Sequence, residues 1–155
     1  MKKIALVLLF AFGTTLSIQA QEFNTIPTSQ EFKLLADGWY KFSLEGTSFD
    51  VEIKAGKFVK GNIKWFDGAT YSGTLAGTEL SGKGTYVWKD GSKYEGSFKK
   101  HMRHGKGSLT KADGTKWSGK WKENLKNGKG KIFDANGNVL EEGTWASNEL
   151  VANKK

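Results

Sequence analysis

The two histidines, His101 and His104, are the side chains of this 155-residue chain best suited to hold a metal ion. A protein metal site needs several nitrogen, sulfur or carboxylate ligands that converge on one point. The chain has no Cys and no other His, and both histidines fall in a connection between expected strands. His101 is therefore expected to occupy a turn and His104 to belong to a repeated motif. The sequence predicts no metal and no cofactor.

Catalysis would need a positioned base beside a nucleophile, or a pair of carboxylates in a cleft. The recurring carboxylates are Asp67, Asp90 and Asp113. They fall in expected turns, where each side chain caps its own backbone. The recurring hydroxyls are Ser72, Ser97 and Ser118. They fall on an outward strand face with no histidine in phase, so the sequence predicts that the protein is not an enzyme.

Four lysines recur at one position beside paired glycines, and they are the candidate anion-binding residues. They are Lys60, Lys83, Lys106 and Lys129. With two strands in each unit, at about 4.8 Å per strand, they would stand about 10 Å apart in a column. Such a column is able to hold a linear or planar polyanion through many weak contacts. The alternative interpretation is that lysine is a solvated filler at this position.

Short blocks of residues recur every 23 positions in the last two thirds of the chain. The first block alternates an aromatic residue, a glycine and an apolar residue: Tyr71, Gly73 and Leu75; Tyr94, Gly96 and Phe98; Trp117, Gly119 and Trp121; and, in weakened form, Gly143 and Trp145. The second block is a Gly-Lys-Gly triplet, with its glycines at Gly82 and Gly84, Gly105 and Gly107, and Gly128 and Gly130. A fixed period of this length indicates a repeat array, in which each unit packs mainly on its neighbours.

Each unit is expected to contribute two strands, because apolar and polar residues alternate with a period of two in both blocks. Pairs such as Asp90-Gly91 and Asp113-Gly114 predict tight two-residue hairpins. The other connection is expected to be longer and polar. Its residue of positive φ is expected at Gly77, His101, Asn124 and Asn148. The chain should therefore run as an antiparallel meander.

The glycines inside these strands need a reason, because glycine weakens a sheet. The reason we expect is close approach, in which the ring of a neighbouring unit lies over glycine backbone. The aromatic residues of the repeat are then the core of a thin sheet rather than a platform for a ligand.

These blocks resemble the MORN repeat. Unit 94–116 is the closest match, as YEGSFKKHMRHGKGSLTKADGTK, and units 71–93 and 117–139 match well. Units 49–70 and 141–151 are partial, and Phe49, Val51 and Ile53 stand one residue off register, which indicates a bulge or an altered edge. The resemblance implies an all-β fold, an elongated, twisted, single-layer antiparallel meander of hairpins with a groove along one face. It implies no enzymatic activity.

A second resemblance is to the aromatic and glycine-rich repeats that bind cell walls. It depends on the single motif Asp37-Gly38-Trp39-Tyr40, which is out of phase with the array. The MORN interpretation is therefore preferred.

Residues 1–20 have the features of a signal peptide. Lys2 and Lys3 precede an apolar stretch from residue 4 to residue 12, and a run of small and polar residues ends at Ala20. Nine apolar residues are too few to cross a bilayer, which takes about 20. The mature chain, residues 21–155, is thus expected to be exported to the periplasm or the extracellular space.

The repeat array is expected to span residues 48–151, with a lead-in segment before it and a charged tail after it. Residues 21–47 form this N-terminal segment, either with a short helix over 28–36 or, as we prefer, with a hairpin between residues 32–35 and 39–44. Residues 152–155 form the tail, which ends in two lysines that discourage strand pairing.

The net charge is +8, and it falls to +6 without the leader, which holds two lysines and no acidic residue. Export argues against nucleic acid, and leaves acidic lipids, phosphorylated glycans and acidic proteins as partners. The first hypothesis is a secreted binding or scaffolding module for protein–protein interaction. The protein would self-associate through a sheet edge, or dock a partner in the groove at Trp121 and Trp145. The alternative is adhesion to acidic lipid or phosphorylated glycan of the cell envelope through the lysine column.

Overall fold

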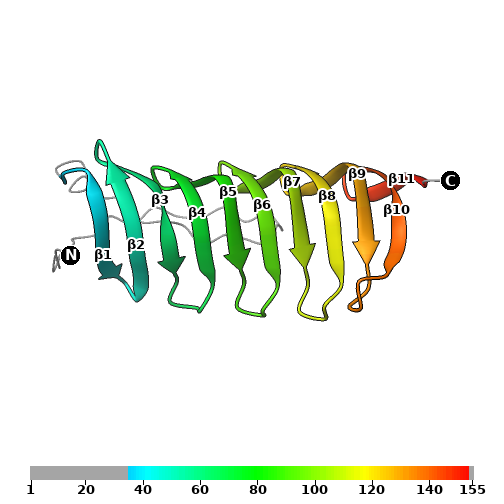
Figure 1. Cartoon of the computed structure of the whole chain (residues 1–155), viewed down its shortest axis with the longest axis horizontal. Coiled ribbons are helices and arrows are strands. Elements are labelled where there is room, and N and C mark those ends of the chain that lie inside the picture. Colours follow the sequence, from blue (N-terminus) through cyan, green and yellow to red (C-terminus); the bar gives the residue numbers. More distant parts are fainter. Residues whose placement is uncertain (1–34, 154–155) are drawn as a thin grey trace, which may run out of the picture.

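The computed structural model describes residues 35–153, which form one antiparallel sheet with its strands in sequential order (Figure 1). Its eleven strands are β1 (Gly38–Leu44), β2 (Thr47–Lys54), β3 (Lys57–Lys64), β4 (Thr70–Ala76), β5 (Glu79–Val87), β6 (Lys93–Lys99), β7 (Met102–Thr110), β8 (Lys116–Lys122), β9 (Leu125–Phe133), β10 (Val139–Ala146) and β11 (Glu149–Asn153). The expected all-β, single-layer meander is confirmed. No helix in this part of the chain is long and apolar enough to cross a membrane.

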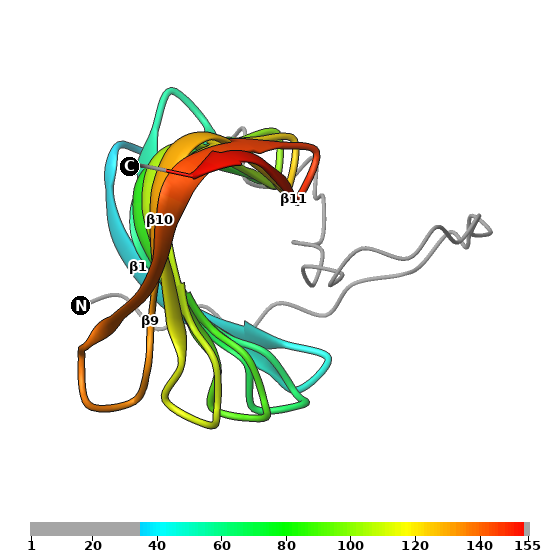
Figure 2. The same cartoon turned by 90° about the vertical axis from the view of Figure 1, so that its right-hand side faces the viewer.

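The sheet is elongated along the direction in which strands follow one another, and each strand is strongly curved (Figure 2). Strand β1 pairs with β2 over its whole length, so the sheet formed by the described residues begins at Gly38. The signal peptide expected over 1–20, residues 28–34 of the segment in which a helix or a hairpin is expected, and the two final lysines lie outside the described residues.

The two kinds of hairpin connection have the reverse of the predicted lengths. The Asp-Gly connections have three-residue loops, because a turn followed by a glycine of positive φ adds one residue to the loop. In the first of them, the Trp65 amide donates to the Ala69 carbonyl oxygen and the Gly68 amide donates to the Trp65 carbonyl oxygen. The other connections have two-residue loops. In most of these both central residues have positive φ, as at Lys100 (50°) and His101 (63°), which is the geometry that matches the twist of the flanking strands.

Bulges explain the imperfect phase of the first unit. In the later units the three residues from Gly73 to Leu75 lie opposite the five residues from Leu80 to Gly84, so the second strand has two extra residues. Between β2 and β3, Glu52 and Ile53 lie opposite Lys60 and Phe58, so this hairpin has one extra residue rather than two. The off-register residues thus mark a smaller bulge.

One face of the sheet carries the core, which is made by rings lying over glycine backbone. The Tyr71 ring lies along its own strand, and its hydroxyl donates to the Thr74 carbonyl oxygen at 2.6 Å. A Cβ added at Gly84 would stand 2.5 Å from that hydroxyl oxygen. The aromatic residues expected in the core, Tyr71, Tyr94, Phe98, Trp117, Trp121 and Trp145, are 0–5% exposed.

From β4 onward, each two-residue turn donates a backbone hydrogen bond to the strand two places before it, and this bond joins successive units. The His101 amide donates to the Leu80 carbonyl oxygen at 3.1 Å, and the Asn124 amide donates to that of Arg103 at 3.1 Å. The Asn124 side-chain oxygen also accepts from the Arg103 amide at 2.8 Å. The turns therefore position each hairpin on the preceding one.

Candidate anion-binding face

The second face of the sheet is polar, and it brings the predicted lysines into one row. Since side chains alternate across a strand, residues paired in register share a face. Lys60 lies opposite Thr74, Lys83 opposite Ser97, Lys106 opposite Lys120, and Lys129 opposite Thr144. The row therefore crosses the sheet from β3 to β10.

A hollow of about 940 Å³ lies along this row between β5 and β9. Apart from glycines, it is lined by Lys83, Thr85, Glu95, Ser97, Lys106, Ser108, Ser118, Lys120 and Lys129. We call this hollow the polar trough. Four ammonium groups thus share one depression with hydroxyl groups and a single carboxylate.

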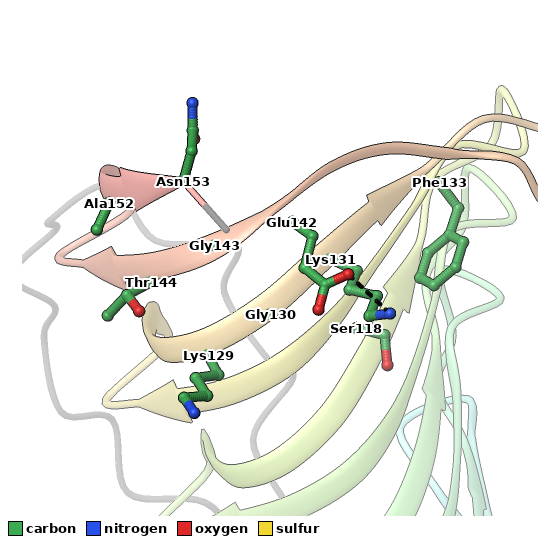
Figure 3. A pocket seen from close by; sticks show the side chains of 10 residues that line it. All are labelled: Ser118, Lys129, Gly130, Lys131, Phe133, Glu142, Gly143, Thr144, Ala152 and Asn153. Carbon is green, nitrogen blue, oxygen red and sulfur yellow. Dashed lines mark ion pairs between the residues drawn. The ribbon is translucent and has the colours of Figure 1, made fainter. Parts of the chain in front are cut away.

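A second hollow of about 670 Å³ shares Ser118 and Lys129 with the trough and continues it toward the C-terminal end. Figure 3 shows the side chains that line it, including the ion pair between Lys131 and Glu142, which are 2.9 Å apart. The depression therefore runs on to β10 and β11.

The structure separates Lys60 from the other three predicted lysines. Its Nζ atom lies 3.2 Å from a carboxylate oxygen of Glu52 and 5.7 Å from the centre of the Trp39 ring. Hydrogen bonds from Lys54 and Lys60 hold the pKa of Glu52 below its usual value. Lys60 is therefore neutralised locally, and the trough does not include it.

None of the four trough lysines forms an ion pair with a described residue, and all four are exposed. Glu95, the one carboxylate in the trough, is paired with Lys93 at 2.9 Å. The four ammonium groups are therefore available to an anion from solution.

Lys120 was missed by reasoning from the period alone. It stands where the preceding unit has Ser97, so it belongs to no recurring lysine position. Its proximity to Lys106 follows only from the pairing of β7 with β8. The signal that could have found it is the register of neighbouring strands.

The charge is unevenly distributed along the array. Residues 35–78 hold five lysines and five acidic residues, a net charge of zero. Residues 79–133 hold fourteen Lys and Arg against five acidic residues, net +9, and residues 134–153 hold four acidic residues and no Lys or Arg. The trough thus lies in the basic segment, whose field attracts anions.

Two further cations lie on the aromatic face rather than on the polar one. The Arg103 guanidinium lies 4.4 Å from the centre of the Trp121 ring and donates to the Asn124 carbonyl oxygen at 3.1 Å. Burial lowers the pKa of Arg103 to about 10, so it remains charged at neutral pH. Lys126 lies 4.8 Å from the centre of the Trp145 ring. These cations belong to the core packing.

The other predicted sites take structural positions. His101 lies in a two-residue turn, and no group of three His, Cys, Asp or Glu residues within 35–153 is arranged to hold a metal ion. The Asp67 and Asp113 carboxylates accept the amides of Ala69 and Thr115 at 2.9 and 2.8 Å, as expected for turn caps. Trp121 and Trp145 are only 4% and 5% exposed, so a docked partner would meet little of either ring.

Apolar side chains are exposed near the C-terminal end of the sheet. Val139, Leu140 and Val151 are 50%, 63% and 60% exposed. They lie on β10 and β11, the last two strands of the array. Such residues suit contact with another protein.

Comparison with protein families gives a match to the MORN repeat over residues 71–93, 94–116 and 117–139. The three matches are consecutive and cover β4 to β9. No curated protein matches the chain. The matched segment includes every residue that lines the polar trough.

Proposed function

Because three consecutive MORN repeats make this chain a member of the MORN repeat family, we propose that it is a non-catalytic binding module that holds an anionic partner in the polar trough. MORN repeats are generally modules that bind proteins or membranes. The proposal is supported above all by one observation: four lysines line a single hollow, and none of them forms an ion pair with another residue in the described range 35–153.

The expected strength of this binding follows from the exposure of the lysines. A single exposed ammonium contributes little, since water and salt screen it. Four of them on one rigid sheet act together, so that the first contact raises the effective concentration of the others. Binding should therefore be appreciable at low salt and weaken steeply as salt is added.

The compartment in which the partner is found is inferred from the signal peptide expected at residues 1–20. We propose that the protein is exported and works in the periplasm or outside the cell. The partner is then an acidic component of the envelope, either acidic lipid or phosphorylated glycan.

A second candidate function is docking of a protein, including another copy of this chain, at the C-terminal end. The exposed Val139, Leu140 and Val151 favour this function, because contact with a partner would remove their apolar surface from water. It does not depend on the trough lysines, and it should be insensitive to salt.

Co-sedimentation of the purified protein with acidic vesicles, neutral vesicles and phosphorylated glycans over a salt series tests the proposal. The trough variant changes Lys83, Lys106, Lys120 and Lys129 to Gln. Its matched control changes Lys57, Lys64, Lys89 and Lys111 to Gln, which removes the same charge from exposed positions outside the trough. Salt-sensitive binding that only the trough variant loses supports the proposal. Equal losses of binding in the trough variant and the control variant would show that binding depends only on the net charge of the protein.

A further inference from the structure

We infer that the polar trough binds a phosphate monoester carried on a sugar, and that Lys106, Lys120 and Lys129 together receive its phosphate. This inference rests on the proposed function and names the anion within it. A phosphate monoester carries a charge of about −2 at neutral pH and presents its acceptor oxygens at one point. It therefore needs several cationic groups that converge, and the central strands of the trough supply them.

One pair of facing lysines distinguishes the centre of the trough from the rest of the lysine row. Lys106 on β7 lies opposite Lys120 on β8. At the other positions of the row a lysine lies opposite a hydroxyl residue: Lys60 opposite Thr74, Lys83 opposite Ser97, and Lys129 opposite Thr144. Like charges that lie directly opposite each other destabilise a sheet. A bound anion removes this repulsion, so the pairing of β7 with β8 is where an anion stabilises the protein most.

Lys129 brings a third ammonium group to the same place. In the register of β8 with β9, Lys120 falls at the bulge and faces residues 127–129. A Cβ added at Gly128 would stand 3.3 Å from the Lys120 Cδ atom, so this side chain lies along β9. Lys106, Lys120 and Lys129 thus line one hollow from the adjacent strands β7, β8 and β9. Adjacent strands are about 4.8 Å apart, and flexible lysine side chains span that distance to reach one phosphate.

The three lysines are not neutralised within the described part of the chain. The described carboxylates that line the two hollows each have another lysine as partner: Glu95 is paired with Lys93, and Glu142 with Lys131, both at 2.9 Å. No ion pair within residues 35–153 includes Lys106, Lys120 or Lys129. A carboxylate, a sulfate ester or a phosphodiester would balance one of these three charges, whereas a phosphate monoester balances about two.

Hydroxyl groups stand beside the lysine cluster. Ser108 on β7 lies opposite Ser118 on β8, and each serine is two residues from the lysine of its own strand. Residues two apart on a strand share a face, so the two hydroxyls and the two ammonium groups lie together, and both serines line the hollow. A hydroxyl donates a hydrogen bond, so the serines suit the phosphate oxygens that the lysines leave free.

The lining of the trough favours a sugar over a lipid as the carrier of the phosphate. Among the described residues, only Lys, Ser, Thr, Glu and Gly line the hollow of about 940 Å³. Binding to a bilayer surface is strongest when apolar side chains enter the acyl boundary beside the basic ones, and the trough offers no such side chain. On β5 and β6 it presents Thr85, Glu95 and Ser97 instead, whose oxygen atoms accept hydrogen bonds from sugar hydroxyls.

NMR titrations of the purified protein at constant low ionic strength test the inference with three probes built on one sugar. They are glucose phosphorylated at its primary hydroxyl, glucose sulfated at the same hydroxyl, and glucuronate. The first carries a charge of about −2, and each of the others carries a charge of about −1. We expect the phosphorylated sugar to bind about tenfold more tightly than either monoanion, a difference of about 1.4 kcal/mol. The amide signals that shift should belong to β7, β8 and β9.

A pH series separates the charge of the ligand from that of the protein. A phosphate monoester takes up its second proton with a pKa of about 6, so it loses most of its second charge between about pH 7.5 and about pH 5. Its affinity should fall over this range toward that of the sulfated sugar. The titratable groups on the neighbouring strands are Glu95 on β6, His104 on β7 and Glu142 on β10. They act on both ligands, so the ratio of the two affinities reports the phosphate alone.

Two substitutions exchange the facing residues of two hairpins. Lys120→Ser gives β8 the residue that β6 has in the preceding unit, and should weaken binding of the phosphorylated sugar about tenfold. Ser97→Lys places a lysine opposite Lys83, and should create a second phosphate site whose shifted signals belong to β5 and β6. The control Lys111→Ser removes one charge from an exposed loop residue outside the trough, and should leave the preference for phosphate intact. Thermal unfolding verifies that each variant is folded.

The possible failures are distinguishable. Equal affinities for the three sugar probes, or an unchanged affinity in Lys120→Ser, would overturn the phosphate inference and leave the proposed anion-binding function standing. Vesicles of one part phosphatidic acid to three parts phosphatidylcholine present a phosphate monoester on a lipid. Binding to these vesicles without binding to the phosphorylated sugar would overturn the assignment of a sugar carrier. The absence of binding to all of these probes would overturn both the inference and the proposed function.

Discussion

The N-terminal strands β1–β4 and the central strands β5–β9 use one backbone plan but present different chemistry. Both parts pair in sequence, bulge on alternate hairpins and place glycines at the centre of the sheet. Residues 35–78 carry no net charge, whereas residues 79–133 carry +9. The comparison teaches that glycines and buried rings determine the sheet, and that the solvent-facing positions are free to specialise.

The core also changes along the array at one column of paired residues, and the change falls between β5 and β7. The residue that receives the hydrogen bond from the following turn is Phe58 in the first unit, then Leu80, Arg103 and Lys126. Leu80 is fully buried beside Leu75, while Arg103 is stacked on the Trp121 ring. The indoles of the later units accommodate a cation that an aliphatic environment would exclude.

The largest expected effect comes from exchanging these core residues. Leu80→Arg places a guanidinium at a fully buried site without an indole opposite, and should lower the free energy of unfolding by about 4 kcal/mol. Arg103→Leu loses the stacking on Trp121 and the bond to Asn124, and should cost about 1 kcal/mol. Urea denaturation measures both. Equal costs would show that the core does not change between β5 and β7 as described.

The next largest effect is expected from substitutions at the central glycines, which both parts of the sheet share. An added Cβ would lie 2.5 Å from the Asp50 carbonyl oxygen at Gly61, and 2.5 Å from the Gly107 Cα at Gly96. Gly61→Ala and Gly96→Ala should each destabilise the protein by about 3 kcal/mol, because backbone cannot move aside.

Gly77→Ala is the control for these glycine variants. Its φ is +63° and an added Cβ meets no atom within 4 Å, so only backbone strain of about 1 kcal/mol is expected. If the protein tolerated Ala at Gly61 but not at Gly96, the N-terminal and central strands would not share the same close packing at their glycines.

A smaller effect is expected from a substitution that extends the basic surface into the N-terminal part. Glu52→Gln removes the carboxylate that pairs with Lys54 and Lys60, and leaves Lys60 available at the end of the lysine row. Affinity for acidic vesicles or glycans should rise while the thermal midpoint stays nearly constant, since the ammonium groups of both ion pairs belong to exposed lysines and such pairs contribute little to stability. Unchanged affinity would confine the binding surface to β5–β9.

The smallest effect concerns the two-residue turns of the central units. Burial lowers the pKa of His101, an effect that Glu79 partly opposes. The unfolded chain therefore takes up its proton first as the pH falls below about 6.5, and the stability contribution present above that pH is lost on acidification. His101→Asn, which copies the next unit, should reduce the loss of stability between about pH 7.5 and about pH 5 in urea denaturation. An equal loss in the variant would assign it to other groups.

The sequence was sufficient to predict the fold, because the 23-residue period directly reports the aromatic and glycine positions that make the sheet. It was not sufficient for the lengths of the turns. The positive φ expected at His101 and Asn124 is confirmed, but Lys100 and Glu123 adopt positive φ as well, so that each of these turns has only two residues. Hydrogen bonds to the preceding unit hold the turns in place. Composition within a turn does not reveal a partner that lies outside it.

The candidate site was predicted only in part, for a similar reason. Lys83, Lys106 and Lys129 follow from the period, and the structure places them in one hollow. The pairing of Lys60 with Glu52 and the approach of Lys120 to Lys106 depend on strand register, which the period does not specify. Neighbouring strands therefore determine which members of a repeated position share a surface.

The hydrogen bonds from each turn to the strand before it give the array a direction of growth. The amides of His101, Asn124 and Asn148 donate to the carbonyl oxygens of residues 21 or 22 positions earlier, which are Leu80, Arg103 and Lys126. A newly duplicated unit would find its acceptor already in place on its predecessor and would present an identical one to its successor. Gene duplication could thus lengthen or shorten such a protein by whole hairpins without redesigning any junction.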